Sequence, residues 1–370
     1  MKIVQILTHL NWGDAIGNEV LAMDEALKRQ GYDARIMAIT VHESLREQAS
    51  EIDFSTITKE DLVIFHKATG DMLIKSVANL SCRKVMVYHN ITPARFFLPY
   101  DRIMAANLWL GRHQLRQFAS RMDACWADST FNAQELIRCG VQQQKIKVLP
   151  ILFSEKETTI QPDPGTKQKL NQQKGIQLLC ISRIAPNKKL EDAIKLYVYY
   201  LRRYDKDAVL YLVGSWDGQE KYYAKLKGFC ADLKLTDNQV VFTGWVTEEE
   251  KEAYLRNTDV LLCMSEHEGF CVPLLEAMKR NLPILAYAEA AVPETIGESE
   301  LLFTKKEYEK MAESLERLQK DELFHTRILK AQQQSLKRFD SVKTRQQFIE
   351  LVYGYSTDTE KKRIGITGDE

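Results

Sequence analysis

The chain has 370 residues, which is long for a single hydrophobic core and favours two domains. With 45% hydrophobic and 28% charged residues, its composition is that of a globular protein and excludes a disordered chain. Lysine plus arginine and aspartate plus glutamate number 51 each, so no overall charge attracts nucleic acid or an anionic membrane. No apolar run approaches the roughly 18 residues that a membrane-spanning helix needs.

The cysteines and the N-terminus bear on the cellular compartment. The seven cysteines are odd in number and contain no C-x-x-C pair, which indicates reduced thiols rather than disulfides or a zinc site. The apolar run 3–7 is short and soon followed by polar residues, so we interpret it as a first strand and not as a signal peptide. We therefore expect a cytoplasmic protein.

Short apolar runs alternate with amphipathic helical patterns, which predicts parallel sheets with crossover helices. In the first half the predicted strands are 2–7, 34–39, 62–66, 84–88, 124–127 and 146–149. The polar segment 154–174 then interrupts this alternation, as a domain linker would. In the second half the predicted strands are 176–181, 208–213, 239–242, 259–263 and 283–286, and helices are predicted over 305–337 and 341–353.

The loop after the first strand contains Gly13 and Gly17, which lead into a helix. Two glycines at a helix start can expose backbone N–H groups to an anion, but they can also form a purely structural turn. The loop lacks the full G-x-G-x-x-G spacing of a dinucleotide site, and no acid for a ribose is evident after the second strand.

His89 ends the fourth predicted strand, where a side chain would point into a cleft between two domains. The alternative is a hydrogen-bonded histidine of the core. Residues 101–121 then combine four arginines and one acid with interleaved apolar side chains. Such a basic amphipathic helix could rest on anionic lipid, or it could be a surface helix that packs its apolar face on the core.

Arg183 and Lys188 follow the first strand of the second half. The planar guanidinium and the compact ammonium are complementary groups for binding a diphosphate. Two glycine turns at later strand ends, Val213-Gly214-Ser215 and Gly244-Trp245-Val246, are further places where backbone can approach a ligand closely.

The most informative segment follows the strand 259–263. Glu268 lies in a loop and Glu276 in the first turn of a helix that we expect to begin at Pro273. Gly269 between them permits close backbone approach. A helix N-terminus facing a strand end suits a phosphate, while carboxylates accept hydrogen bonds from sugar hydroxyls.

These motifs together resemble the retaining glycosyltransferases of the family 4 type, also called glycosyl transferases group 1. The resemblance is carried by the E-x7-E pair Glu268 and Glu276 and by the R-x4-K pair Arg183 and Lys188. It implies the GT-B fold, an α/β architecture of two Rossmann-like doubly wound domains facing across a cleft. We expect domains at 1–153 and 175–338, a linker at 154–174, a crossover helix at 339–356 on the N-terminal domain, and a polar tail at 357–370.

The resemblance also implies roles for individual residues. Glu268 and His89 would lie beside the donor sugar, Glu276 would bind the ribose hydroxyls, and Arg183 with Lys188 would stabilise the departing diphosphate. The other donor-binding positions that it implies are Gly13, Gly17, Gly214, Trp245, Val246, Gly269, Phe270 and Cys271. Cys271 and Val272 depart from the residues usual in the family, which could narrow the sugar pocket.

We expect no cofactor and no required metal. The one Asp-x-Asp, Asp205 to Asp207, precedes a strand, and no H-E-x-x-H motif occurs. Leaving-group charge would then be stabilised by the two cations and by helix N-termini.

The resemblance implies transfer of a hexose, such as mannose, from a GDP- or UDP-linked donor to a glycan or glycolipid in bacterial surface polysaccharide synthesis. The enzyme would be cytoplasmic, with peripheral membrane contact through 101–121 as one option. The alternatives are a nucleotide-sugar 2-epimerase of the same fold and a catalytically silent sugar-binding subunit.

Overall fold

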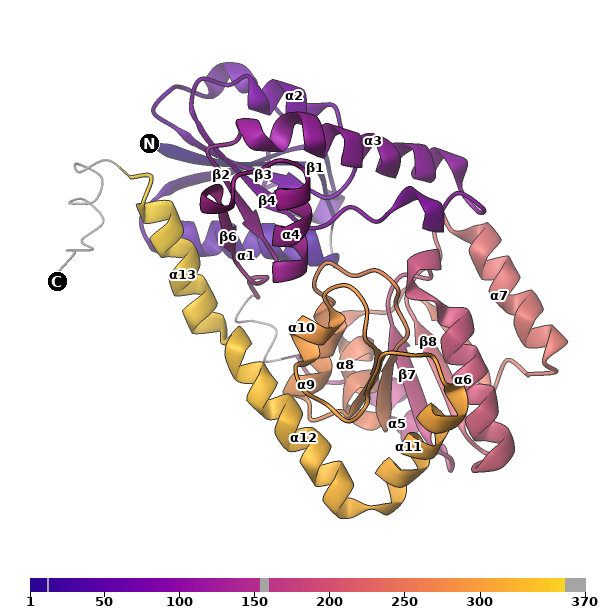
Figure 1. Cartoon of the computed structure of the whole chain (residues 1–370). Helices are drawn as coiled ribbons and strands as arrows, with labels where there is room; N and C mark the ends of the chain where they lie inside the picture. The colour runs from indigo at the N-terminus through magenta and orange to yellow at the C-terminus, as the bar shows by residue number, and fades with distance from the viewer. Residues whose placement is uncertain (12, 154–159, 357–370) are drawn as a thin grey trace. The chain divides into compact units, whose positions relative to one another are not determined.

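The computed structural model describes residues 1–11, 13–153 and 160–356, which divide into two compact units (Figure 1). Described residues of 1–93, 106–153 and 339–356 form the first unit, and those of 94–105 and 160–338 form the second. The predicted tail 357–370 and the first part of the predicted linker, 154–159, lie outside the described residues.

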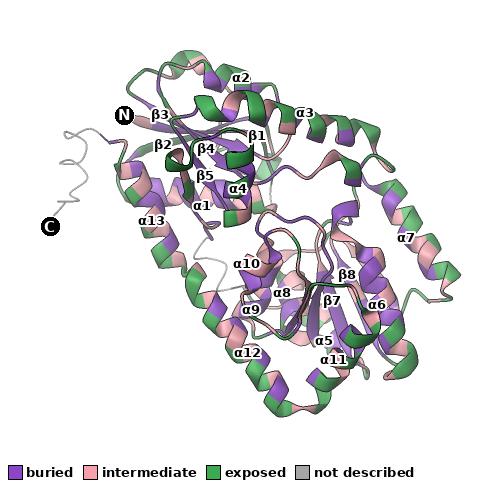
Figure 2. Ribbon diagram, viewed as in Figure 1, coloured by how far each residue is buried: buried purple, intermediate pink, exposed green. Residues whose placement is uncertain are grey.

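The first unit is built on a six-stranded parallel sheet in the order β2-β1-β3-β4-β5-β6. Its strands are β1 (Lys2–Leu10), β2 (Asp33–Val41), β3 (Leu62–Lys67), β4 (Arg83–Tyr88), β5 (Ala124–Ala127) and β6 (Ile146–Val148). Every residue of β3 and of β5 is buried (Figure 2), which is why these strands appear in the sequence as continuous apolar runs.

The second unit holds another six-stranded parallel sheet, in the order β12-β11-β10-β7-β8-β9. Its strands are β7 (Gln177–Ile181), β8 (Val209–Val213), β9 (Val240–Gly244), β10 (Val260–Cys263), β11 (Ile284–Tyr287) and β12 (Leu302–Phe303). The chain winds outward from β7 in one direction and from β10 in the other, so β7 and β10 are neighbours at the point where the strand order reverses. Ligands of open α/β sheets bind beyond the carboxyl ends of the strands at such a point.

Helices connect the strands in both units. In the first unit they are α1 (Ala15–Arg29), α2 (Leu73–Ala78), most of α3 (Arg102–Phe118), α4 (Thr130–Arg138) and α13 (Ser341–Tyr353). In the second they are α5 (Pro164–Asn171), α6 (Leu190–Arg203), α7 (Glu220–Asp232), α8 (Glu248–Asn257), α9 (Val272–Lys279), α10 (Val292–Ile296), α11 (Tyr308–Lys320) and α12 (Glu322–Leu336). Throughout the described residues, the helices are too short or too polar to cross a bilayer.

The last helix, α13, follows the second unit in sequence but packs in the first. The ring of Phe348 lies edge-on to Trp126 of β5, with 5.9 Å between the centroids. Both side chains are fully buried, and the Gln347 side chain donates a hydrogen bond of 2.8 Å to the carbonyl of Val148. Burial of these two aromatic rings stabilises the attachment of α13 to the first unit.

The predicted strands are confirmed to within a few residues, whereas three other predictions need correction. Residues 305–337 form two helices rather than one, because Asp321 accepts a hydrogen bond from the Phe324 N–H and starts α12. The short strand β12 has no counterpart among the predicted strands. The predicted linker includes α5, a helix with Asp163 as its N-cap and Leu170 buried.

The predicted N-terminal domain 1–153 also needs correction, because residues 94–105 belong to the second unit. In that unit the ring of Tyr100 lies edge-on to Tyr222, with 5.2 Å between the centroids. Its hydroxyl accepts a hydrogen bond of 2.9 Å from the Lys225 ammonium. These contacts attach the segment to the helices of the second unit.

Candidate functional site

The candidate site of the second unit lies where the loops after β7 and β10 meet. The structure brings two of the predicted site residues together: the Lys188 ammonium lies 2.7 and 2.8 Å from the two carboxylate oxygens of Glu268. The Glu268 side chain is 9% exposed and that of Lys188 21% exposed. Burial lowers the pKa of Lys188, but the charge of Glu268, its hydrogen bond and the two nearby cysteines together raise this pKa above its ordinary value. Lys188 is therefore a cation held at the strand ends by a buried carboxylate.

Backbone hydrogen bonds connect these two loops directly. The carbonyl of Asn187 accepts a hydrogen bond of 2.9 Å from the Glu266 N–H, and the Asn187 side chain donates one of 3.0 Å to the carbonyl of His267. Asn187 is buried, so its amide fixes the position of both loops. Asn187 was not predicted as a site residue, because its pairing depends on a loop about 80 positions further along the chain.

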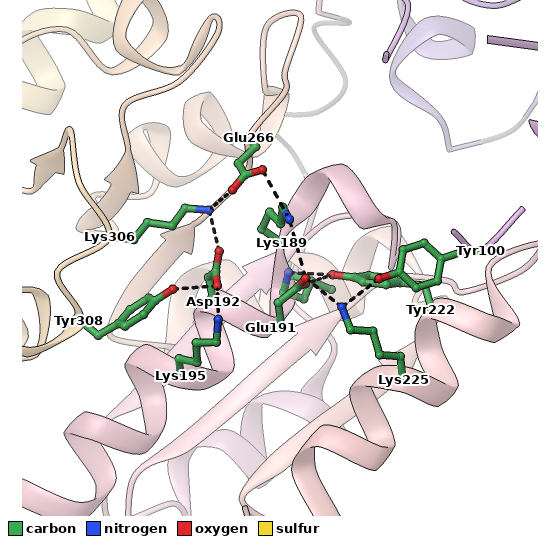
Figure 3. Close-up of polar contacts among 11 residues, drawn as sticks. Tyr100, Lys189, Glu191, Asp192, Lys195, Tyr222, Lys225, Glu266, Lys306 and Tyr308 are labelled. Carbon is green, nitrogen blue, oxygen red and sulfur yellow. Dashed lines mark hydrogen bonds and ion pairs between the residues drawn. The ribbon is translucent and has the colours of Figure 1, made fainter. Parts of the chain in front are cut away.

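A second layer of charges supports the acidic loop from the side of α6 (Figure 3). The Lys306 ammonium lies 2.6 Å from Asp192 and 2.9 Å from Glu266, and Tyr308 donates a hydrogen bond of 2.8 Å to Asp192. Lys189, the last residue before α6, lies 3.5 Å from Glu266 and has left-handed backbone geometry with φ of 52°. These partly buried pairs restrain the segment that carries Glu268.

Arg183 lies two residues beyond the end of β7 and is exposed. Within the described residues it makes no ion pair at 4 Å or less, which leaves its guanidinium accessible to an anion. The neighbouring Ser182 is in tight contact with Gly214, where an added Cβ would lie 2.0 Å from the Ser182 carbonyl oxygen. Only glycine fits at position 214, so the ends of β7 and β8 can approach each other closely.

Glu276 is the fifth residue of α9, which begins at Val272, one residue earlier than predicted. It therefore lies in the second turn of the helix and not in the first. Its carboxylate is 2.9 Å from the Lys251 ammonium, which also lies 2.7 Å from Glu248. Burial lowers the pKa of Lys251, but these two carboxylates raise it well above its ordinary value. Lys251 was not predicted, because nothing in its local sequence links it to α9.

The loop between the two glutamates has one buried and one accessible side chain. Phe270 is buried, and its carbonyl accepts a hydrogen bond of 2.7 Å from the Thr295 hydroxyl. Cys271 is half-buried and has left-handed geometry with φ of 74°. Gly269, half-buried between Glu268 and Phe270, is the loop position without a side chain.

The predicted donor-binding positions Trp245 and Val246 follow β9. Gly244 has φ of 74°, and its carbonyl accepts a hydrogen bond of 3.1 Å from the Gly214 N–H, which joins the ends of β8 and β9. The next side chain, Trp245, is 65% exposed, and Val246 is half-buried. Gly214, Trp245 and Val246 thus follow strands on the same edge of the sheet as Lys188 and Glu268.

In the first unit, the glycine loop after β1 differs from the prediction. Gly13 is exposed, with φ of 77° and open space around its Cα. The Gly17 N–H instead donates a hydrogen bond of 2.6 Å to Asp14, which caps α1. Because that N–H already has a partner, the expectation that Gly17 exposes its N–H to an anion is wrong. A glycine is required there because an added Cβ would lie 2.3 Å from the Asn11 carbonyl oxygen.

His89 is part of a buried polar chain in the first unit. Its Nδ1 lies 3.1 Å from Asp128 and 3.4 Å from Glu19, and its Nε2 lies 2.9 Å from Nδ1 of His66. The Nε2 of His66 is in turn 3.1 Å from the side-chain oxygen of Gln5. An imidazolium at His89 and a neutral His66 satisfy every link of this chain, with His89 donating from both nitrogens.

The charges of this cluster explain that protonation pattern. Burial lowers the pKa of His89, but Asp128 and Glu19 more than offset this and raise it to about 9. Burial, and then the charge of Asp128, raise the pKa of Glu19 to about 8. Burial and the charge of His89 hold the pKa of His66 well below its ordinary value. The His89 side chain is 2% exposed and both ring nitrogens have partners in the first unit, so its role beside a sugar stays a prediction.

Each of the two units is an α/β unit built on a six-stranded parallel sheet. The family model described as glycosyl transferases group 1 matches residues 164–353, about half of the chain. The chain belongs to this family.

Curated relatives are distant in sequence. The serotype-specific mannosyltransferase WbdA of Escherichia coli is 24% identical over 283 residues, which cover 73% of this chain and 33% of WbdA. The chain thus spans about a third of the length of this relative. The GDP-mannose-dependent alpha-(1-6)-phosphatidylinositol monomannoside mannosyltransferase of Mycobacterium tuberculosis is 25% identical over 71% of this chain and 75% of the relative.

Solved structures of low sequence identity have the same fold. HepE of Anabaena, crystallised with UDP and glucose, aligns with a TM-score of 0.73 at 19% identity, over 96% of this chain and 100% of HepE. A glycosyltransferase from Rickettsia africae aligns with a TM-score of 0.70 at 14% identity, over 99% of both chains. The two-domain α/β GT-B fold predicted from the sequence is confirmed.

Proposed function

We propose that the chain is a retaining hexosyltransferase that transfers a hexose from a nucleoside diphosphate to a hydroxyl of a glycan or lipid-linked glycan. The observation that supports it most directly is the Lys188–Glu268 pair at the reversal point of the second sheet. This pair places a cation and a carboxylate together at the edge where open α/β sheets bind ligands. Family membership supports the same class of reaction.

In this proposal the donor diphosphate binds between Arg183, Lys188 and the N-terminus of α9. Arg183 is exposed and has no ion-pair partner among the described residues, so it is ready to bind a phosphate. Lys188 gives up part of its hydrogen bonding to Glu268 and binds the phosphate instead. Glu276 accepts hydrogen bonds from the ribose hydroxyls. The two relatives reported above are mannosyltransferases, and one of them is GDP-mannose-dependent. We therefore propose GDP-mannose as the first donor to test among the GDP- and UDP-linked hexoses.

The proposed reaction breaks the bond between the anomeric carbon and the β-phosphate oxygen and forms a bond from the acceptor oxygen to that carbon on the same face. The acceptor proton passes to the departing phosphate. Negative charge grows on the β-phosphate as the bond breaks, so Arg183 and Lys188 stabilise the transition state more than the ground state. Glu268 opposes the positive charge that develops on the sugar ring. This scheme needs no metal.

We also propose a peripheral contact with the cytoplasmic face of a membrane, through residues 101–121. Ile103, Trp109 and Leu110 of α3 are 85%, 63% and 41% exposed, and Arg116 is exposed on the same helix. Exposed apolar and basic side chains together suit an anionic lipid surface. Arg112 is not available for this contact, because it lies 2.7 Å from Glu135. Co-sedimentation with anionic vesicles, lost in Trp109→Ser, tests this contact.

The experiment for the main proposal incubates the protein with a panel of GDP-, UDP- and ADP-hexoses and follows release of the nucleoside diphosphate. We expect slow release from one donor, faster release with a hydroxyl acceptor, and a product that keeps the anomeric configuration. Glu268→Gln should abolish transfer, whereas Glu313→Gln, an exposed glutamate of α11, should leave it unchanged. Conversion of the donor to its 2-epimer would indicate an epimerase instead, and neither release nor conversion would indicate a silent binding subunit.

A further inference from the structure

Two cysteines and Glu268 converge at the carboxyl end of β10. Cys263 is the last residue of that strand, and Cys271 is the N-cap of α9. Their sulfur atoms lie 3.9 Å apart, and a carboxylate oxygen of Glu268 lies within 4.8 Å of both. All three side chains line a cavity of about 20 Å³. A cavity of this size has room for one water molecule or one ion.

The sulfur separation is that of a shared metal ion rather than of a disulfide. Two thiolates bound to one tetrahedral Zn²⁺ at about 2.3 Å lie roughly 3.8 Å apart. The observed 3.9 Å is close to that separation. A disulfide requires about 2.05 Å, so the two sulfurs would have to approach by nearly 2 Å.

Charge also favours a divalent cation here. Two thiolates and one carboxylate carry three negative charges, and the Lys188 ammonium beside Glu268 supplies one positive charge. A bound Zn²⁺ would bring the group of four side chains to neutrality. Glu268 can serve Lys188 and a metal together, because a carboxylate has about four lone-pair sites and Lys188 uses one on each oxygen.

We propose that Cys263, Glu268 and Cys271 form a binding site for one thiophilic divalent cation, Zn²⁺ in the first instance. Binding releases the two thiol protons to solvent, so the affinity rises with pH. The fourth position of the ion is open to water or to an anionic oxygen. The spacing of eight residues between the cysteines differs from the C-x2-4-C spacing of common zinc motifs, which is why the sequence alone indicated no zinc site.

The other group of potential metal ligands among the described residues, Glu19, His89 and Asp128, carries no such proposal. A protonated His89 already supplies a positive charge beside Glu19 and Asp128, and its second nitrogen is bonded to His66. A cation would have to displace that proton.

The proposed ion would act as an inhibitor and not as a cofactor. It would bind Glu268 and Cys271, both of which belong to the loop that the proposed function assigns to the donor sugar. Metal-free protein would then be the active form, and added zinc would exclude the donor. This consequence rests on the proposed transferase function, whereas metal binding itself does not.

In the first test, the phosphine-reduced full-length protein is titrated with Co²⁺ and its absorption spectrum is measured. In the second, Zn²⁺ is titrated in the presence of a chromophoric chelator that competes with the protein for the metal. We expect one equivalent of Co²⁺ to give a sulfur-to-cobalt charge-transfer band with the visible bands of tetrahedral geometry, and Zn²⁺ to displace it. Cys271→Ser and Cys263→Ser should each weaken metal binding by more than about 100-fold. Loss of a residue that only hydrogen-bonds to a metal ligand already lowers metal affinity by about 10–100-fold. The control is Cys139→Ser, a half-buried cysteine of the first unit.

Circular dichroism establishes that each variant is folded, and the two single variants report on the site independently. Absence of the charge-transfer band in the reduced protein would overturn the proposal, as would a band of equal strength in folded Cys271→Ser. Because this titration requires no activity, its failure is distinguishable from failure of the proposed function. If Co²⁺ binds as expected, zinc should also block release of the nucleoside diphosphate, and Cys263→Ser, outside the predicted donor-binding positions, should resist this inhibition.

Discussion

The buried cluster of Glu19, His89 and Asp128 should make the stability of the protein fall as the pH rises, and Glu19→Gln should remove much of this dependence. The pKa of Glu19 is about 8 in the folded protein, against an ordinary value of 4.5. The folded state therefore binds a proton that the unfolded state loses between these two values. Since stability falls with pH wherever the folded state holds more protons, the loss begins near pH 4.5 and is complete above about 8.

At about 1.4 kcal/mol per pKa unit, this difference corresponds to at most about 5 kcal/mol of unfolding free energy. His89 acts in the same direction. Its pKa is raised from 6.5 to about 9, so its contribution is fully present below 6.5 and is lost as the pH rises through about 9. Glutamine at position 19 mimics the protonated carboxyl. We therefore expect Glu19→Gln to change stability little at a pH of about 5 and to raise it by roughly 3–5 kcal/mol at about 9.

Urea unfolding of the wild-type protein and of Glu19→Gln at pH values of about 5, 7 and 9 measures this effect. The matched control is Glu25→Gln, on the same helix α1, whose carboxylate forms an exposed pair with Arg29. Glu25→Gln should change the free energy of unfolding by less than about 1 kcal/mol at every pH. A stability difference between Glu19→Gln and wild type that stays constant with pH would refute the assignment of a protonated Glu19.

Three further predictions concern the proposed transferase reaction. Arg183→Ala and Lys188→Ala should each lower kcat by about 10²–10³-fold. The double variant should lose less kcat than the product of the two single losses, because both cations act on one diphosphate. A normal kcat at saturating donor in both single variants would contradict this prediction. Glu276→Ala should weaken donor binding by roughly 2–4 kcal/mol, measured by calorimetry, and an unchanged Kd would contradict the ribose role. Activity should survive EDTA, so a loss beyond about tenfold that Mg²⁺ restores would show that a metal takes part.

Much of the fold could be predicted because its strands are buried on both faces. The residues of β3, β5 and β10 are all buried, and such strands leave unbroken apolar runs in the sequence. The strand β12 has only two residues, Leu302 and Phe303, too few for any periodicity to appear. The helix α5 was hidden by its polar composition, since Leu170 is its one buried residue.

The candidate site was predictable only where strand-end positions determine it. Lys188 and Glu268 follow neighbouring parallel strands, so their proximity follows from the strand order. Lys251 and Asn187 act through partners that are distant in sequence, and no local pattern identifies such pairs. The Gly17 prediction failed for a different reason, because Asp14 caps the helix and takes the N–H that an anion would need.

The Lys188–Glu268 pair also suggests how binding and chemistry are coupled in the proposed function. Without a partner, the buried Glu268 carboxylate would be costly, and Lys188 removes that cost while no donor is bound. A diphosphate competes for the same ammonium and brings more charge than one carboxylate. As Lys188 turns toward the phosphate, Glu268 loses part of its neutralising partner at the moment when a sugar with developing positive charge lies beside it. The positive charge that develops on the sugar ring then stabilises the Glu268 carboxylate in place of the lysine. The arrangement therefore favours bond cleavage only when a complete nucleotide sugar occupies the site.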